Sequence, residues 1–442
     1  MKRGWLLLGW AVLLCPAYAQ ERAFTLQECV DYALEHRTEV AIGAYSVEDA
    51  GKEVRYNRLQ QLPDLSASFA HSMNWGRSLN MEKYEWEDSK NQYGNLSLSS
   101  SVTLFAGFQL RNRIKASKLN ALLQKTALQK VRDDIRLEVI QAFYEAVAAE
   151  EQKRLSSLFY ESDVQQERKA RQLDSLKRMS LPDLLEIAGQ TRKALLEKKS
   201  SEKQWHLALL NLKKCMNYQE DGVLTLCREQ EVEKEGVVPE AGEVYAMALT
   251  RLPELRQYDM DSLLLRNQWK QLRGNFSPTL SVSGLWYSRY QNRLEAPVSG
   301  GHYSWWEQVR DNNYKQVGIA LNIPLFNRQT VRRQMNLLKT EMATKRLNKR
   351  QALADVRYEI EQLCLEASNR RDNLWVLEAQ EANDKKIYEL RQVQYQQGKL
   401  SVYDLLTAET NWKNSRITLE LERYNLRCYL EMLKIYMGME KL

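Results

Sequence analysis

The sequence predicts a mainly helical protein with a smaller β portion, in which two long helical hairpins and two strand pairs follow one duplicated plan. Three observations support this prediction. Matching residues recur at constant spacing in the two halves of the 442-residue chain, long stretches contain neither glycine nor proline, and apolar residues alternate with polar ones between the helical stretches.

The duplication is visible as residues that match across the two halves. Three groups recur after 215 positions: Ala33-Leu34, Glu39 and Pro63, which match Ala248-Leu249, Glu254 and Pro278. Later groups recur after 221 positions: Leu104-Phe105, Glu138 and Asp183-Leu184-Leu185, which match Leu325-Phe326, Glu359 and Asp404-Leu405-Leu406. The shift falls between the paired strands, where a loop can absorb it. We expect a first structural repeat over 20–238 and a second over 239–442.

Each repeat contains one exceptionally long helical stretch. No glycine or proline occurs between Gly107 and Pro182, or in the 73 residues from Leu325 to Gln397. A helix of that length spans about 110 Å, which is typical of a coiled coil or a helical tunnel rather than of a globular domain. Seven apolar positions have an average spacing that matches a coiled-coil seam: Leu128, Val131, Ile135, Val139, Ala142, Ala146 and Ala149.

Shorter helices complete each hairpin. Helical patterns cover 25–60 and 180–216 in the first repeat, and 241–275 and 401–437 in the second. Two short helices placed end to end are about as long as one long helix, so we expect each repeat to form an antiparallel pair of helical columns.

The strand pairs are predicted over 63–104 and 278–324, where the apolar period changes to two. Leu96, Leu98, Val102 and Leu104 alternate with polar residues, and so do Val317, Ile319, Leu321 and Ile323 with polar or small ones. Polar connections with aromatic residues are expected at 75–93 and 288–314, with Tyr84, Trp86, Trp305 and Trp306. These strands are long enough to cross a bilayer. The alternative is a four-stranded soluble sheet with one wet face, which alternation alone does not exclude.

The N-terminal segment 1–19 resembles a signal peptide. Lys2 and Arg3 precede an apolar run, and Ala17-Tyr18-Ala19 supplies the small residues of a cleavage site. The alternative is a lipoprotein signal that uses Cys15, which the bulky Leu14 disfavours. The segment therefore predicts export.

Composition excludes several classes of protein. The net charge of +7 falls to +5 without Lys2 and Arg3, and the charged residues (27%) carry both signs, so nothing indicates nucleic-acid binding. After the signal, no stretch approaches the roughly 20 apolar residues of a membrane-spanning helix. No cluster of Cys, His and carboxylate residues has the spacing of metal ligands, and no catalytic or nucleotide-binding motif is present. We expect no metal, no cofactor and no enzymatic activity.

The five remaining cysteines have irregular spacing, so we interpret them as buried apolar residues, with Cys215 and Cys227 a weak disulfide candidate.

Four strands cannot close a barrel, and an open sheet edge is not tolerated in lipid. Three copies would supply twelve strands, enough for a closed barrel with a lumen. The strand count therefore suggests a homotrimer with an outer-membrane lipid boundary. Basic residues open both long helices, and they would face lipid headgroups or simply be solvated: Arg111, Arg113, Lys115, Lys118, Arg328, Arg332 and Arg333.

Nearly all of the mature chain resembles the TolC family of outer-membrane efflux proteins. The most specific segments are 104–107 (LFAG), 323–328 (IPLFNR) and 398–401 (GKLS) followed by Asp404-Leu405-Leu406. The resemblance implies a trimeric 12-stranded outer-membrane β-barrel that continues into a periplasmic α-barrel. It also implies two partners, a periplasmic adaptor protein and an inner-membrane pump, in efflux or type I secretion. The competing hypothesis from the residues is a periplasmic coiled-coil adaptor or scaffold.

The resemblance also assigns candidate functional residues. Two helix-to-helix turns would contact the adaptor: Lys177, Arg178, Met179 and Ser180 in the first, and Gly398, Lys399, Leu400 and Ser401 in the second. The first departs from the family pattern, since Lys177 stands where the second has Gly398.

A gate is expected just beyond the second turn. Three copies of Asp404 would form an acidic ring that favours cations. Tyr395 matches a family position that latches neighbouring helices, and Thr407 stands where some relatives have a second acid. The alternative interpretation of Asp404 is a carboxylate that only stabilises the first turn of the returning helix.

Overall fold

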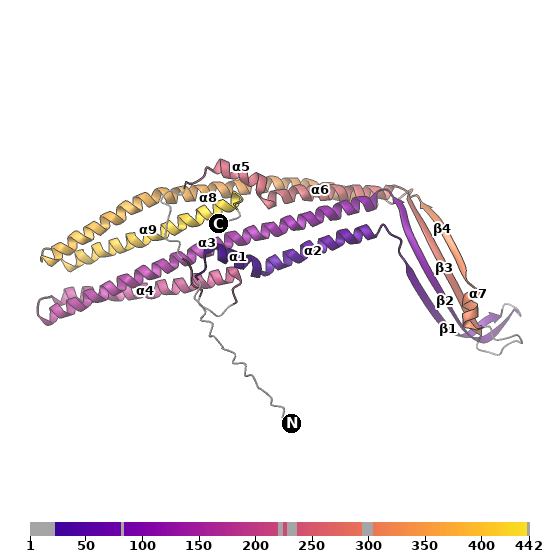
Figure 1. Ribbon diagram of the computed structural model, residues 1–442, viewed down its shortest axis with the longest axis horizontal. Coiled ribbons are helices and arrows are strands. Elements are labelled where there is room, and N and C mark those ends of the chain that lie inside the picture. The colour runs from indigo at the N-terminus through magenta and orange to yellow at the C-terminus, as the bar shows by residue number, and fades with distance from the viewer. Residues whose placement is uncertain (1–22, 81–83, 220–223, 228–236, 294–303, 440–442) are drawn as a thin grey trace, which may run out of the picture. The chain divides into compact units, whose positions relative to one another are not determined.

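The computed structural model describes residues 23–80, 84–219, 224–227, 237–293 and 304–439. The predicted signal peptide at 1–19 lies outside these residues. The described chain is mainly helical, with one antiparallel sheet (Figure 1). It divides into two compact units, which we call the helical unit (the described parts of 1–40, 132–251 and 358–442) and the sheet unit (41–131 and 252–357).

The element order runs through one plan twice. The first series is α1 (Leu26–His36), α2 (Thr38–Leu59), β1 (Ser66–Asn80), β2 (Glu85–Ala106), α3 (Gln109–Ser175) and α4 (Leu181–Met216). The second is α5 (Ala241–Arg251), α6 (Pro253–Arg273), a short 3-10 turn η1 (Gly274–Phe276), β3 (Thr279–Arg293), α7 (Trp305–Asp311), β4 (Tyr314–Asn322), α8 (Thr330–Gln396) and α9 (Val402–Tyr436). Both long helices, α3 and α8, contain 67 residues and span about 100 Å. The repeat boundaries stay a prediction.

The two short helical stretches that precede the strand pairs are each broken, which the sequence analysis did not predict. Arg37 is extended between α1 and α2. Its guanidinium donates to the Cys215 carbonyl at 2.9 Å and to the Glu138 carboxylate at 3.0 Å. Leu252 is extended between α5 and α6, because proline at 253 disfavours helical backbone in the residue before it.

The sheet unit contains four antiparallel strands in the order β1-β2-β3-β4. β2 pairs with β3 over Asn91–Ala106, so strands from the two halves of the chain form one sheet. Residues 75–80 and 85–93, expected in a connection, are strand instead: 75–80 pair with 85–90, and 91–93 continue β2 opposite 72–74. The sequence pattern did not predict these strand residues, because polar residues occupy both faces, as at Glu85, Asp88 and Lys90, and no alternation with apolar residues results.

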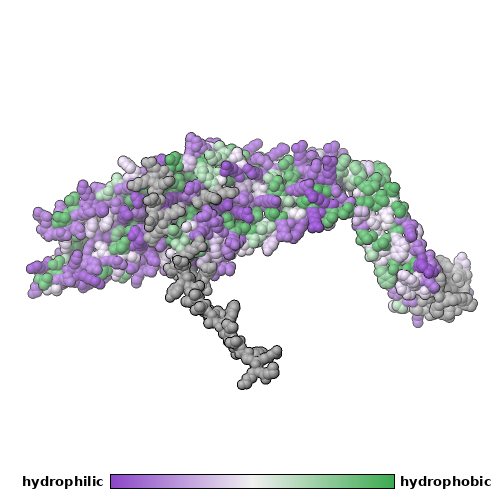
Figure 2. Space-filling model, viewed as in Figure 1, coloured by the Kyte–Doolittle hydropathy of each residue, from purple (hydrophilic) through white to green (hydrophobic). Residues whose placement is uncertain are grey.

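The sheet leaves large apolar side chains exposed. Val317, Ile319 and Leu321 of β4 are 82%, 75% and 62% exposed, and Trp75 of β1 is 75% exposed. Hydrophobic residues gather over the part of the strands next to the helices (Figure 2). Within the described residues, no helix combines the length and the apolar character that a membrane crossing requires.

The core of the helical unit is packed by small and branched residues from α1, α3, α4 and α9. Fully buried examples are Val30, Ala33, Ile140, Leu212 and Leu433. The cysteines at 29, 215, 364 and 428 are also buried, and burial raises the pKa of the Cys29 and Cys428 thiols to about 12. Cys215 and Cys227 are free thiols, so the disulfide candidate was wrong.

One glycine fixes the junction between β2 and α3. Gly107 has φ +58°, and a Cβ there would lie 2.5 Å from the carbonyl oxygen of Gly274 and 2.6 Å from the Ser277 Cβ. The backbone of this junction therefore requires both the left-handed conformation and the absence of a side chain.

We expect Gly107→Ala to lower the free energy of unfolding of the detergent-solubilised protein by about 2 kcal/mol or more, because it adds a left-handed alanine and a backbone clash. Thermal unfolding followed by circular dichroism measures the effect. Gly51→Ala is the matched control: it lies exposed within α2 with open space around it, and it should be neutral or stabilising. Equal stability of the two variants would contradict the role of Gly107.

Candidate functional site

The two helix-to-helix turns of the helical unit have the same backbone geometry. At the end of α3, Lys177 is left-handed (φ 54°), and the Arg178 N–H donates to the Leu173 carbonyl at 2.9 Å. At the end of α8, Gly398 is left-handed (φ 71°), and the Lys399 N–H donates to the Gln394 carbonyl at 3.0 Å. Both turns thus close with a six-to-one hydrogen bond. The lysine adopts the conformation in which glycine has no steric cost.

The helices that leave these turns begin with matching caps. The Ser180 hydroxyl accepts from the Asp183 N–H at 3.3 Å and donates to its carboxylate at 2.7 Å. The Ser401 hydroxyl accepts from the Asp404 N–H at 3.2 Å and donates to its carboxylate at 2.6 Å. The geometry of Asp404 is therefore that of a capping carboxylate, the alternative left open by the sequence. Asp183 is its counterpart 221 residues earlier.

One contact distinguishes Asp404 from Asp183. The Arg391 guanidinium of α8 lies 3.8 Å from the Asp404 carboxylate and donates to the Asp404 carbonyl at 3.2 Å. The residue 221 positions before Arg391 is Ala170, which is buried. The carboxylate of the second turn therefore lies beside a cation, whereas the matching carboxylate of the first turn, Asp183, has no arginine at the equivalent position.

The other predicted gate residues lie on the same two helices. Tyr395 of α8 packs against a small buried cluster of Ala170, Leu184, Ile187 and Val402. Its pKa is raised by burial and by the nearby Asp183 carboxylate. The Thr407 hydroxyl is exposed and donates to the Tyr403 carbonyl at 2.8 Å. The structure brings Tyr395 toward Asp183 of the first turn, while Thr407 only bonds its own helix.

The side chains of the predicted turn residues are mostly open to solvent. Lys177, Arg178, Ser180, Gly398, Lys399 and Ser401 are exposed, and Met179 and Leu400 are half-buried. Met179 packs against the same cluster as Tyr395. The turns thus combine a fixed backbone with accessible polar side chains, as a docking surface requires.

A buried ionic cluster, which the sequence analysis missed, joins α3 to α9 above these turns. The Lys413 ammonium is hydrogen-bonded to the Asp163 carboxylate and lies 2.9 Å from that of Glu409. Gln166 donates to both Glu409 oxygens at 3.1 Å. The three ionisable side chains are at most 9% exposed. Two carboxylates therefore share one ammonium, and full ionisation leaves a net negative charge in the interior.

Aromatic side chains enclose the ionic cluster. Trp412 of α9 stacks on Tyr388 at 5.4 Å and meets Phe159 edge-on at 5.9 Å. The Lys413 ammonium lies 5.5 Å from the Phe159 ring centroid, and the indole N–H of Trp412 donates to Glu381 at 3.1 Å. These rings exclude water from the charges, which strengthens the ion pairs and makes any unpaired charge costly.

The excess of carboxylates over cations in this cluster affects the pKa of Asp163. Burial, opposed by Lys413, raises the pKa of its carboxyl to about 6, and the second carboxylate oxygen is buried without a hydrogen-bond partner. The pKa of Tyr388 is raised to about 12 by burial and by the Glu409 and Asp163 carboxylates. The Asp163 carboxyl therefore keeps its proton to a higher pH than an exposed aspartate does, up to about pH 6, and is mostly ionised at neutrality.

The sequence did contain a signal for this cluster. Asp163 continues the heptad positions 149, 156 and 170, where Ala149, Ser156 and Ala170 are small. A carboxylate on an apolar seam needs a buried partner. The counterparts of Glu409 and Lys413 in the first repeat are Ala188 and Arg192, so the comparison of repeats also marks the position.

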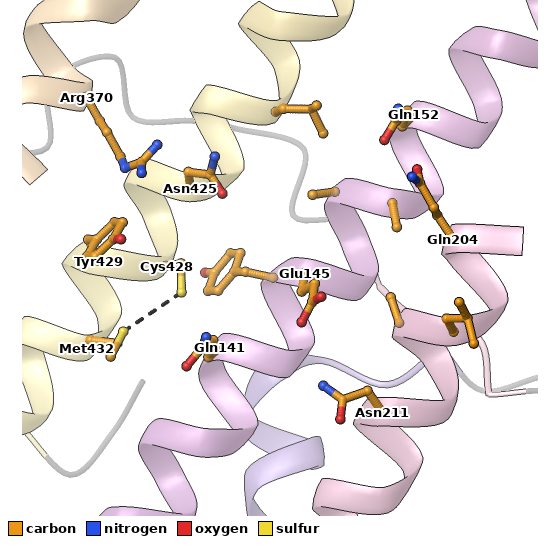
Figure 3. Close-up of a pocket in the computed structure, with 16 residues that line it drawn as sticks. Gln141, Glu145, Gln152, Gln204, Asn211, Arg370, Asn425, Cys428, Tyr429 and Met432 are labelled. Atoms are coloured by element: carbon orange, nitrogen blue, oxygen red, sulfur yellow. Dashed lines mark hydrogen bonds between the residues drawn. The ribbon is translucent and has the colours of Figure 1, made fainter. Parts of the chain in front are cut away.

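A cavity of about 720 Å³ opens between α3, α4, α8 and α9 of the helical unit (Figure 3). Amide side chains provide much of its polar lining: Gln141, Gln152, Gln204, Asn211 and Asn425. Arg370 reaches it from α8, held by Glu422 at 2.8 Å and lying 5.1 Å from the Tyr429 ring. Among the described residues, no group of three His, Cys, Asp or Glu side chains is arranged to hold a metal ion.

Comparison with known proteins identifies the family and the fold. The model of the outer membrane efflux protein family matches residues 29–173 and 244–438. No curated protein matches the sequence.

Solved structures of transmembrane channels are similar over 93% of the chain. CusC has a TM-score of 0.78 at 14% identity, with 91% of that chain covered. The CmeC outer membrane channel of Campylobacter jejuni has a TM-score of 0.74 at 18% identity and 85% coverage. The MtrE outer membrane channel of Neisseria gonorrhoeae, solved in its open state, has a TM-score of 0.72 at 16% identity and 88% coverage. The predicted fold class is confirmed.

Two substitutions in the ionic cluster should change the free energy of unfolding by very different amounts. We expect Lys413→Met to lower the free energy of unfolding by about 3–5 kcal/mol near neutral pH, because it leaves two carboxylates buried without a cation. Asp163→Asn leaves a neutral pair of Lys413 and Glu409 and should be far milder. Denaturant unfolding of both variants measures the difference.

The pH dependence gives a further readout of the same prediction. The folded protein holds the Asp163 proton up to about pH 6, whereas the unfolded chain releases it near the ordinary aspartate pKa of 3.8. The folded wild type therefore loses stability as the pH rises from about 3.8 to about 6. Asp163→Asn should remove this loss. An unchanged pH slope in Asp163→Asn contradicts the titration of Asp163.

Proposed function

Because the chain belongs to the outer membrane efflux protein family and has the fold of outer membrane channels, we propose that three copies assemble into the exit duct of a tripartite efflux or type I secretion system. Each copy contributes four strands to a 12-stranded barrel in the outer membrane. The helical hairpins extend into the periplasm, and substrates delivered by an inner-membrane pump pass through the lumen. The channel itself carries out no chemistry.

The observation that carries this proposal is the sheet. Its outer strands, β1 and β4, each pair on one side only among the described strands, and apolar residues of β4 are largely exposed. Open edges and exposed apolar faces are unfavourable in water, and a closed barrel in lipid removes both. Three sheets of this size supply the strands for a barrel with a lumen. If the chain were a periplasmic adaptor or scaffold, these apolar side chains would stay exposed to water.

The adaptor is proposed to bind the two turns at 177–180 and 398–401. Each turn has a backbone fixed by the six-to-one hydrogen bond and side chains that are mostly exposed. A rigid turn loses little conformational entropy when a partner binds.

Membrane fractionation and conductance test the proposed function together. The expressed protein should fractionate with the outer membrane, migrate more slowly on gels before heating, as a trimer, than after heating, as a monomer, and give stable conductance steps in planar bilayers. Recovery as a soluble periplasmic monomer would contradict the channel.

Asp404 is proposed as the acidic ring of the gate, with Tyr395 as a latch and Thr407 beside it. In three copies, Asp404 would stand around the mouth of the tunnel with Arg391 as its neighbour. A ring of carboxylates at a narrow mouth attracts cations.

We expect Asp404→Ala to lower the cation selectivity of the conducting channel, measured as the reversal potential in a salt gradient across a planar bilayer. Asp183→Ala is the matched control, because it loses the same capping contact at the first turn. If both variants keep the wild-type reversal potential, Asp404 acts only as a cap.

A further inference from the structure

Seven basic residues surround the junctions between the sheet and the two long helices, and we call them the basic collar: Arg111, Arg113, Lys115, Lys118, Arg328, Arg332 and Arg333. All are exposed. The strand register brings the two groups to one end of the sheet, since Ala106 at the end of β2 and Asn322 at the end of β4 both pair with Thr279. The collar therefore belongs to one end of the sheet unit.

The cations of the collar lack the carboxylate partners that cations have elsewhere in the sheet unit. Lys345 and Lys349, further along α8, lie 2.8 and 2.6 Å from Asp261 and Asp259. Lys130 of α3 lies 3.2 Å from Glu254. Within the described residues, no collar cation has a carboxylate within 4.0 Å, and Arg113 bonds only the neutral amide of Gln60.

The electrostatics of the helices increase this excess of positive charge. The first turn of a helix carries a partial positive charge, which acidic residues normally offset. Neither α3 nor α8 has an acidic residue in its first turn. The carboxylate of Asp64, before β1, is already bonded to the N–H and hydroxyl of Ser101. The collar is thus a concentrated positive surface that nothing in the described chain neutralises.

A wide apolar surface lies immediately beside the collar, on the side of the strands. Its exposed members precede the basic residues in both halves of the chain: Leu104, Phe105 and Phe108, then Ile323, Leu325 and Phe326. Leu325 and Phe326 are 93% and 83% exposed. An apolar surface bordered by cations matches a lipid monolayer, in which hydrocarbon chains lie next to anionic headgroups.

A surface groove of about 510 Å³ lies along the start of α8, and all of its lining residues come from 329–340. Two guanidinium groups, from Arg332 and Arg333, line it together with Gln329, Asn336, Thr340 and Leu337. Guanidinium, amide and hydroxyl donors that line one surface groove are suited to an anionic oxygen group.

We propose that the basic collar binds the phosphate groups of anionic phospholipids on the membrane face from which the helices emerge, while the adjoining apolar residues enter the hydrocarbon. This inference rests on the proposed membrane location of the sheet. The ligand class is an anionic diacyl phospholipid, and its binding fixes how deep the sheet sits in the bilayer.

The test compares two double substitutions on α8, Arg332→Gln with Arg333→Gln and Arg346→Gln with Arg350→Gln. The second pair is the matched control, because Arg346 and Arg350 are also exposed on this helix but lie beyond the collar. The purified, delipidated full-length proteins are titrated with phosphatidylglycerol or with phosphatidylcholine in detergent, and bound lipid is measured by native mass spectrometry.

The wild type and the control should bind phosphatidylglycerol more tightly than phosphatidylcholine. The collar variant should lose about fivefold in phosphatidylglycerol affinity per arginine, roughly 25-fold in total. Equal loss in the control pair, or equal affinity of the wild type for both lipids, overturns the proposal. Displacement of bound phosphatidylglycerol by inorganic phosphate at about tenfold molar excess also overturns it, because the collar would then be a site for free phosphate.

The outcome is separable from that of the proposed function. Conductance and heat-modifiable migration of each variant report whether the channel assembles, and lipid binding is measured on the same preparations. A wild type that conducts but does not discriminate the two lipids rejects the collar and retains the channel. A protein that discriminates the lipids but fails to conduct retains the collar and rejects the channel.

Discussion

The backbone ladder between β2 and β3 is the interaction on which the sheet unit depends. It is the one ladder that joins the first half of the chain to the second among the described strands, and it runs from Asn91 to Ala106 on β2. Every backbone group in these strands must be paired, in water or in lipid. Because this ladder aligns the end of β2 with the start of β3, and the β3–β4 ladder aligns the start of β3 with the end of β4, both long helices begin at the same end of the sheet. The position of the collar and of the exposed apolar residues beside it follows from this register.

The helical unit depends on a different constraint, the reversal of direction after a helix of 67 residues. Each reversal needs a left-handed residue, a six-to-one hydrogen bond and a serine cap on the returning helix. The two turns meet this requirement with different residues, Lys177 and Gly398. A left-handed lysine costs about 1–2 kcal/mol relative to glycine, and the surrounding hydrogen bonds must offset it. That the geometry persists in spite of this cost indicates that the turn itself, rather than its glycine, is what the fold requires.

The sequence predicted the elements that local patterns determine. The absence of Gly and Pro predicted α3 and α8, and the alternation at 95–104 and 317–323 predicted the inner parts of the strands. The break at Arg37 was missed because it depends on Glu138 and the Cys215 carbonyl, which are distant in sequence. The break at Leu252 was predictable, since Pro253 alone accounts for it. The outer strand segments were missed because polar residues on both faces give no periodic signal.

The candidate site divides in the same way. The turns and caps were predictable from Gly398, Ser401 and Asp404, which act on their own segment. The buried ionic cluster was harder, because its meaning comes from a pairing of residues 250 positions apart. The heptad pattern shows that Asp163 lies on a buried seam and needs a partner. It does not identify Lys413 as that partner, because the two residues meet only when α9 packs against α3.

Charged residues are paired differently in three parts of this chain: the interior of the helical unit, the solvated part of α8, and the junction with the sheet. In the interior of the helical unit, two carboxylates share one lysine behind aromatic rings, so the unit keeps ions and water out while retaining one site for a proton. Further along α8, still within the sheet unit, Lys345 and Lys349 pair with aspartates, as on an ordinary solvated helix. At the junction with the sheet, the acids are missing while the cations remain. Solvation alone would favour a mixture of both signs there, as it does further along α8 at Lys345 and Lys349. The selective loss of carboxylates next to an exposed apolar surface therefore argues for an anionic neighbour supplied from outside the chain.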